Sequence, residues 1–160
     1  MDVRHLSLSI DCPLQQAYDF LCVPEHFCHW AAGLASGLQQ IDGKWLATTA
    51  HGVMQIEFSH ANAFGVLDHW VHVQPGVIVY VPLRLVANGN GCELTLSLFR
   101  QPGMREAQFA ADAKLVRRDL LAAKQLLEAL SHSTGRLFLD QPVQLPATLL
   151  LRQQPGQPRQ

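Results

Sequence analysis

The stretch MREAQFAADAKLVRRDLLAAKQLLEAL, residues 104–130, decides the fold. It contains neither proline nor glycine, the two residues least compatible with a helix interior. Its apolar residues recur at steps of three and four positions, at Phe109, Ala113, Val116, Leu120, Ala123, Leu127 and Leu130. This spacing places them on one face of a helix of roughly 25 residues, about 37 Å long. The stretch therefore predicts one long amphipathic helix with an apolar face that must be covered.

The sequence that precedes this helix alternates with the period of two that is typical of strands. Turn signals at Asp42-Gly43, Pro75-Gly76 and Asn88–Gly91 divide the alternating region into short pieces. We expect strands at 3–11, 34–41, 44–50, 52–60, 65–74, 77–87 and 92–100. Two short helices are expected over 13–22 and 24–30, since Pro13 and Pro24 suit a first helical turn.

This order of elements predicts an α+β fold. Strands joined by tight turns form an antiparallel meander with one apolar face, and only the final helix is long enough to cover that face. We therefore expect a helix-grip domain over residues 1–130, in which a curved sheet of six to seven strands wraps around the long C-terminal helix. A single helix seldom fills the hollow of a strongly curved sheet, so an apolar ligand cavity is expected between them.

Residues 131–160 differ in character from the rest of the chain. The run Ser131–Gly135 is expected to end the helix, and four prolines and many glutamines follow. Composition favours a loosely attached tail that is partly disordered, from Gln153 onward above all. The small apolar clusters at 137–139 and 148–151 leave a second interpretation open, in which the tail docks on the domain or on a second subunit of a homodimer.

Charge and composition exclude several classes of protein. The 160 residues carry a formal net charge of −1, so the basic surface of a nucleic-acid binder is not expected. No apolar run reaches the roughly 18 residues of a membrane span, and no targeting signal is visible at the N-terminus, so a cytoplasmic protein is expected. The charged fraction of 16% is low, which suits an apolar pocket or a partner surface, or simply a neutral surface.

Several short blocks resemble bacterial SRPBCC proteins, the START-like superfamily that includes polyketide cyclase/dehydrase-type domains. Residues 65–71 (GVLDHWV) are similar to its "GVLDH" strand, and residues 81–86 (VPLRLV) to its "NPMRVV" strand. The other similar blocks are 98–104 (LFRQPGM), the helix 109–128, and the opening Cys12-Pro13 with Tyr18–Leu21 and Trp30. The resemblance spans about residues 4–130 and departs from the pattern at Val81 and Trp70. It implies the helix-grip fold; members bind lipids, polyketides or hormones, act as cyclases or dehydratases, or serve as chaperone co-factors.

His69 is the leading candidate for a functional polar residue. It lies in the middle of the apolar face formed by Leu67, Val71 and Val73, so it points into the cavity if that face is internal. A neutral imidazole there could orient a carbonyl or hydroxyl or act as a general base; the alternative is a core histidine paired with a neighbour such as Glu57 or a hydroxyl. Asp68 is expected on the opposite, convex surface with Trp70, so an Asp-His dyad is not expected.

The residues expected to line the cavity come from the short helices, the inner strand faces and the long helix. They are Phe27, Trp30, Trp45, Met54, Ile56, Phe58, His60, Leu67, His69, Val71, Val81, Leu83, Leu96, Phe109, Ala113, Val116 and Leu120. Arg84, by alternation, faces away from Leu83 and either binds an anionic group or pairs with Asp68 or Glu93 across the sheet.

No metal or cofactor is expected. Cys22, His26, Cys28 and His29 cluster in the sequence, but their spacing does not match zinc-ligand patterns. No nucleophile elbow, P-loop or dinucleotide motif is present, and Gly89-x-Gly91 is a hairpin signal. Binding of a small apolar, lipid- or polyketide-like molecule is therefore the leading hypothesis. The alternatives are a cyclase- or dehydratase-type enzyme that uses His69 as its acid or base, and a protein-interaction or co-chaperone-like module.

Overall fold

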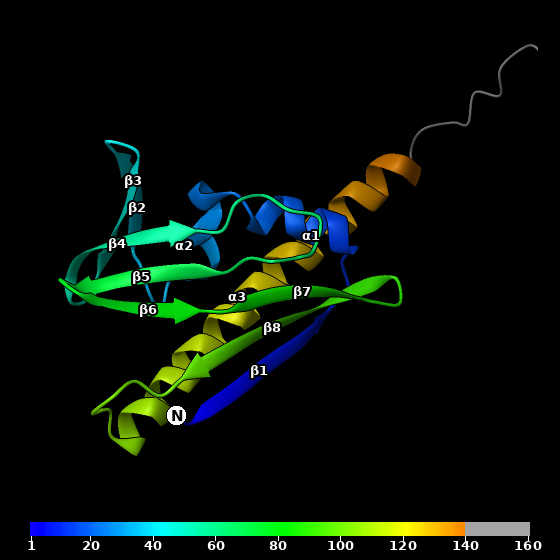
Figure 1. Cartoon of the computed structure of the whole chain (residues 1–160). Coiled ribbons are helices and arrows are strands. Elements are labelled where there is room, and N and C mark those ends of the chain that lie inside the picture. The colour runs from blue at the N-terminus through cyan, green and yellow to red at the C-terminus, as the bar shows by residue number, and fades with distance from the viewer. Residues whose placement is uncertain (140–160) are drawn as a thin grey trace, which may run out of the picture.

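The computed structural model describes residues 1–139, with side chains as far as Ser133 (Figure 1). The elements in chain order are β1 (Val3–Ile10), α1 (Leu14–Leu21), the 3-10 turn η1 (Pro24–His26), α2 (Phe27–Trp30), β2 (Gly37–Ile41), β3 (Lys44–Thr49), β4 (Gly52–Phe58), β5 (His69–Gln74), β6 (Val77–Val81), β7 (Leu83–Asn88), β8 (Gly91–Phe99) and α3 (Glu106–Leu139). Among these residues no helix is both long enough and apolar enough to cross a bilayer.

The strands form two antiparallel groups that are joined into one curved layer. One group has the order β1-β8-β7 and the other the order β2-β3-β4-β5-β6. They meet where β6 and β7, consecutive parts of one long strand, are separated by Pro82, which has no N–H to give to a ladder. Counted as one, β6 and β7 give the seven strands of the predicted α+β helix-grip fold, which is confirmed. The prediction of an uninterrupted strand over 77–87 was wrong at Pro82.

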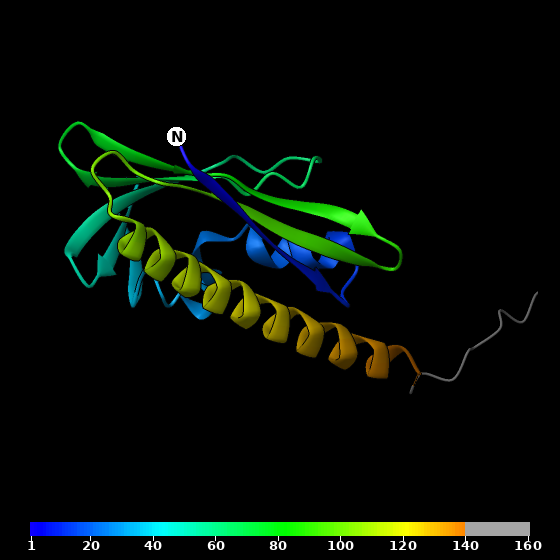
Figure 2. The same cartoon turned by 90° about the horizontal axis from the view of Figure 1, so that it is seen from below.

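The long helix α3 lies on the same side of the sheet as α1 and α2 (Figure 2). Its backbone comes closest to β1, α2 and α1. The predicted apolar stripe faces inward, since Phe109, Leu120, Ala123 and Leu127 are buried. Burial of these side chains, together with Leu94 and Leu96 of β8, makes the core between helix and sheet.

The end of α3 differs from the prediction. The helix continues through Ser131–Gly135 to Leu139, so the expectation that it ends near Leu130 was wrong. The Ser133 hydroxyl donates to the carbonyl of Ala129 at 2.9 Å, a bond inside the helix that satisfies the side chain without breaking the helix. The expected docking or disorder of the tail beyond Leu139 lies outside the described residues.

The short helix α2 is tied to α3 by one carboxylate. Oδ1 of Asp119 accepts the backbone N–H of Gly33 at 2.9 Å. A side chain at position 33 would meet this carboxylate, because an ideal Cβ there lies 2.6 Å from Asp119 Oδ2. The contact holds the chain just after α2, and thereby positions Phe27 and Trp30 under the sheet.

Candidate functional site

The concave face of the five-stranded group is the candidate site, and its residues follow from strand register. One row of paired residues crosses the sheet as Phe58, His69 and Val81. The next row is formed by Trp45, Ile56, Val71 and Val79, and the third by Leu38, Ala47 and Met54. Because these partners share a face, the three rows form an apolar surface in which His69 is the polar member. Gln40, opposite Trp45, extends the middle row onto the exposed edge strand.

His69 is buried on this face, as one of the two predicted orientations requires. Its side chain is 4% exposed, and its ring packs against Phe27 at 5.4 Å and Phe58 at 6.1 Å between centroids. Its Nδ1 lies 3.4 Å from the carbonyl oxygen of Leu67. A hydrogen bond of this length is weak and offsets little of the free-energy cost of burying the imidazole. Burial lowers the pKa of His69 from 6.5 to about 4, so the imidazole is neutral near pH 7.

Stability should therefore depend on pH through His69. The unfolded chain binds a proton below pH 6.5 while the folded chain does not until about pH 4, so stability is complete above pH 6.5 and falls as pH drops toward 4. Between pH 7 and pH 5 this amounts to roughly 2 kcal/mol. Urea unfolding of the wild type and of His69→Phe at both pH values measures it, and the wild type should lose about 2 kcal/mol more than the variant.

The exposed His60 provides the control for this prediction. His60→Phe should leave the difference in unfolding free energy between pH 7 and pH 5 as in the wild type. If His69→Phe behaves as His60→Phe does, His69 is not buried as a neutral group in solution.

An aromatic cluster surrounds His69 from the side of α2. The Phe27 ring packs edge to face against Trp30 and Phe58, with ring centroids 5.0 and 5.2 Å apart. The rings of Phe58 and Trp45 also pack edge to face, with centroids 6.3 Å apart. Trp30 is 4% exposed, and its Nε1–H has no acceptor in the described part of the chain. A buried donor without a partner is costly, because the hydrogen bond that it makes to water in the unfolded chain is lost and nothing in the described chain replaces it.

The predicted cavity residues are distributed over three degrees of burial. The buried ones are Phe27, Trp30, Ile56, Leu67, His69, Val71, Leu83, Leu96, Phe109, Ala113 and Leu120. Half-buried are Trp45, Met54, Phe58, Val81 and Val116, all apolar and yet in part accessible. His60 lies beyond the end of β4 and is exposed, so it stands outside the concave face.

Two open grooves lie on the described surface. One, of about 480 Å³, lies between β1 and α3 and is lined by Arg4, His5, Leu6, Ala110, Ala113, Lys114 and Arg117. The other, of about 340 Å³, lies where the β7–β8 hairpin meets α3 and is lined by Ser9, Ile10, Asp11, Asn88, Asn90, Gly91, Cys92, Lys124 and Glu128. Ala113 is the one predicted cavity residue among these linings, and His69 is in neither.

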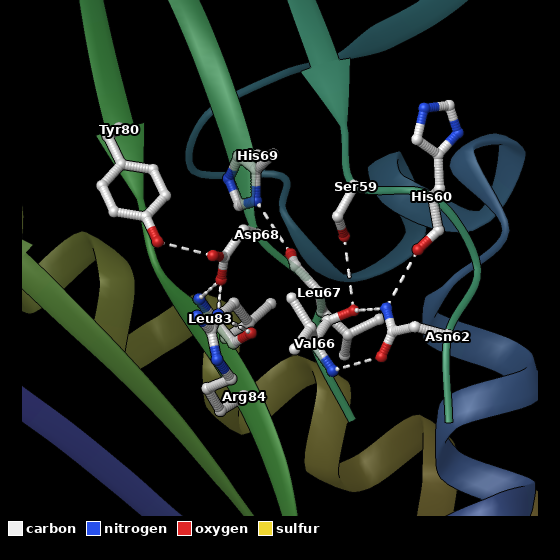
Figure 3. A network of polar contacts seen from close by, with 10 residues as sticks. All are labelled: Ser59, His60, Asn62, Val66, Leu67, Asp68, His69, Tyr80, Leu83 and Arg84. Atoms are coloured by element: carbon white, nitrogen blue, oxygen red, sulfur yellow. Dashed lines mark hydrogen bonds and ion pairs between the residues drawn. The ribbon is translucent and has the colours of Figure 1, made fainter. Parts of the chain in front are cut away.

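The convex side of the sheet carries a polar network around Asp68 (Figure 3). Its carboxylate accepts the hydroxyl of Tyr80 at 2.5 Å and the backbone N–H of Leu83 at 2.9 Å, and forms an ion pair with Arg84. The predicted pairing of Arg84 with Asp68 is thus confirmed. The expectation that Asp68 lies on the surface was wrong: it is 5% exposed, because these partners enclose it.

A second set of bonds, which sequence reasoning missed, shapes the chain before β5. Oδ1 of Asn62 accepts the backbone N–H groups of Phe64 and Val66, at 3.0 and 3.1 Å. Its Nδ2 donates to the carbonyl oxygens of His60 and Val66, both at 2.9 Å; Figure 3 shows the bonds of Asn62 to His60 and Val66. This loop replaces the first four residues of the strand predicted over 65–74. An asparagine three residues before Gly65, which has a φ of +68°, was the available signal.

The cysteine and histidine cluster near α2 does not form a metal site. In the described chain no three His, Cys, Asp or Glu residues are arranged to hold a metal ion. Burial raises the pKa of the Cys22 and Cys28 thiols, which disfavours the thiolate that zinc requires. His26 instead stacks on Phe20 at 4.3 Å, and its Nδ1 lies 2.9 Å from the carbonyl oxygen of Phe20.

Comparison with known proteins identifies the fold and leaves the family open. No protein-family model and no curated protein matches the chain. Among solved structures, XoxI from Bacillus cereus superposes with a TM-score of 0.64 at 11% identity, over 81% of this chain and 98% of its own. DynU16, from the dynemicin biosynthetic locus, gives 0.62 at 16% identity over 82% of this chain and 49% of its own. The Aha1 dimer from Colwellia psychrerythraea gives a TM-score of 0.61 at 10% identity, over 80% of this chain and 97% of its own. At such identities these similarities show the helix-grip fold and nothing finer.

Proposed function

We propose that this protein binds a small, largely apolar molecule, lipid-like or polyketide-like, on the concave face between the five-stranded group and α3. The observation that supports this most directly is the set of three apolar rows with His69 as their polar member. A second support is the accessible surface that the half-buried apolar residues of this face keep, namely Leu38, Trp45, Met54, Phe58, Val79 and Val81. A ligand that covers these side chains gains roughly 25 cal/mol for each Å² of apolar surface removed from water.

The polar groups of this face indicate what kind of ligand it suits. The Trp30 Nε1–H is a buried donor without an acceptor in the described chain. In the neutral His69 ring Nδ1–H donates to the Leu67 carbonyl oxygen at 3.4 Å, which leaves Nε2 as a hydrogen-bond acceptor. Neither group carries charge near pH 7. The site therefore favours a neutral ligand with an acceptor for Trp30 and a donor for His69, such as a hydroxylated aromatic ketone, on an apolar skeleton.

Binding is better supported than catalysis at this face. A general base works best when its pKa lies near the working pH, and the pKa of His69 is lowered to about 4. Its sequence neighbour Asp68 bonds to Tyr80, Leu83 and Arg84 on the convex side, so it does not orient the imidazole. Cyclase or dehydratase chemistry through His69 would need a substrate that supplies its own polarising group.

The unpartnered indole of Trp30 offers a direct test. Thermal unfolding and fluorescence titration should be measured with neutral polycyclic aromatic ketones and, separately, with the corresponding hydrocarbons, which lack an acceptor. A ketone that accepts from Nε1 should bind Trp30→Phe about three- to tenfold more weakly, the effect of one lost hydrogen bond. Ligands without such an acceptor should bind the wild type and the variant alike.

Trp70→Phe is the matched control, because Trp70 stacks on Tyr80 at 5.4 Å on the convex side. It should leave every affinity unchanged. The proposal fails if no compound of either class raises the unfolding temperature, or if Trp70→Phe weakens ketone binding as much as Trp30→Phe does.

A further inference from the structure

The strand β1 is the outermost strand of the three-stranded group and has one free edge (Figure 1). Even-numbered residues turn their backbone groups toward β8, as the bond from the N–H of Arg100 to the carbonyl of Asp2 shows. In an antiparallel pair the N–H and C=O of one residue point the same way, so the odd-numbered residues Val3, His5, Ser7 and Ser9 face the free edge. Unpaired edges of this kind are templates for a further strand.

One end of this edge is already occupied by side chains of α3. Nζ of Lys124 donates to the carbonyl oxygen of Ser9 at 2.6 Å, and Oε1 of Glu128 accepts the N–H of Asp11 at 2.9 Å. Farther back, the outward backbone groups of His5 and Ser7 have no such partner within residues 1–139. The groove of about 480 Å³ opens beside these residues, with Leu6, Ala110 and Ala113 as its apolar part.

The charged lining of this groove is entirely basic. Arg4 is engaged, since its Nη2 lies 2.6 Å from Glu106 Oε1 and its guanidinium lies over the Phe109 ring. Lys114 and Arg117 have no ion pair or hydrogen bond in the described chain. Arg117 lies two helical turns before Lys124 on the same side of α3. It therefore lies beside the unpaired part of the β1 edge, as Lys124 lies beside the part at Ser9 that it occupies.

We infer that this groove binds an extended acidic segment of a partner protein, which adds to β1 as a further strand and places carboxylates against Lys114 and Arg117. Backbone pairing gives affinity in this mode, and side chains at alternate positions give specificity. The free N–H and C=O groups favour a peptide over a lipid, which could not use them. The sequence of residues 140–160 is a poor match for a basic groove, because it contains one acidic residue, Asp140, and two basic ones, Arg152 and Arg159.

The test uses the full chain and a fluorescein-labelled peptide of alternating glutamate and valine, seven residues long, followed by anisotropy. Ser7→Pro removes an outward N–H and leaves the even-numbered ladder to β8, so it should weaken binding at least tenfold. Lys114→Glu should weaken it at least fivefold. A lysine-valine peptide of equal length should bind at least twentyfold more weakly than the acidic peptide.

Two matched variants separate strand addition from charge alone. Gln40→Pro, the control for Ser7→Pro, removes a backbone N–H on the free edge of β2. Lys44→Glu, the control for Lys114→Glu, makes the same charge change at an exposed residue of the β2–β3 hairpin. Both should bind the peptide within twofold of the wild type, and thermal unfolding should show that all four variants remain folded. The inference is overturned if the acidic peptide does not bind, or if either control weakens binding as much as its counterpart does. It is also overturned if light scattering shows a dimer of the chain that Ser7→Pro converts to a monomer.

Discussion

Replacing Asp68 with alanine is expected to destabilise the fold by roughly 3 kcal/mol, although Asp68 lies on the side of the sheet opposite the proposed site. Its carboxylate holds the buried N–H of Leu83, the Tyr80 hydroxyl and the Arg84 guanidinium, and so fastens β5 to β6 and β7 across the break at Pro82. Removing it leaves the Leu83 N–H buried without an acceptor. Urea unfolding monitored by circular dichroism measures the loss.

Two milder variants show whether this effect belongs to the buried network. Tyr80→Phe removes one hydrogen bond and should cost about 1 kcal/mol. Glu57→Ala removes an exposed carboxylate that lies 2.8 Å from His72 on the same face, and should cost less than about 0.5 kcal/mol. If Asp68→Ala costs no more than Glu57→Ala, the network around Asp68 does not persist in solution.

Leu120→Ala is expected to destabilise the protein by about 3 kcal/mol, because Leu120 is 1% exposed in the core between α3 and the sheet. The neighbouring Leu121, 39% exposed, is the internal control. Leu121→Ala should cost less than about 1 kcal/mol, since its side chain loses little contact. Denaturant titration of both variants gives the comparison, and equal losses would show that the predicted apolar stripe is not the buried face of α3.

The parts of the fold that could be predicted are those governed by periodicity. The spacing from Phe109 to Leu127 determines which face of α3 is buried, and alternation determines which strand residues share a face. Alternation thus groups His69 with Leu67 and Val71 on one face, but it does not determine which side of the sheet that face is. The direction of His69 was the open question, and the register of β5 against β4 and β6 answers it.

Other features depend on contacts between distant residues, which no local pattern records. Asp68 is buried because Tyr80 and Arg84 approach it from other strands. The loop before β5 is held by Asn62, whose amide bonds form only once His60 and Val66 are brought together. The accessible space under the sheet depends on how Trp45, Met54 and Phe58 pack, which hydrophobic spacing does not determine.

The pairing of β1 has a consequence for the order in which the molecule assembles. Every other strand pair of the described chain joins strands that are consecutive in sequence, whereas β1 pairs with β8, Val3 opposite Phe99. Hairpins between consecutive strands close within microseconds, but closing so long a loop costs more entropy and requires β8 to exist. During synthesis from the N-terminus, Leu6 and Leu8 therefore have no strand partner until β8 has been synthesised. The strand that is made first is the one that completes the sheet.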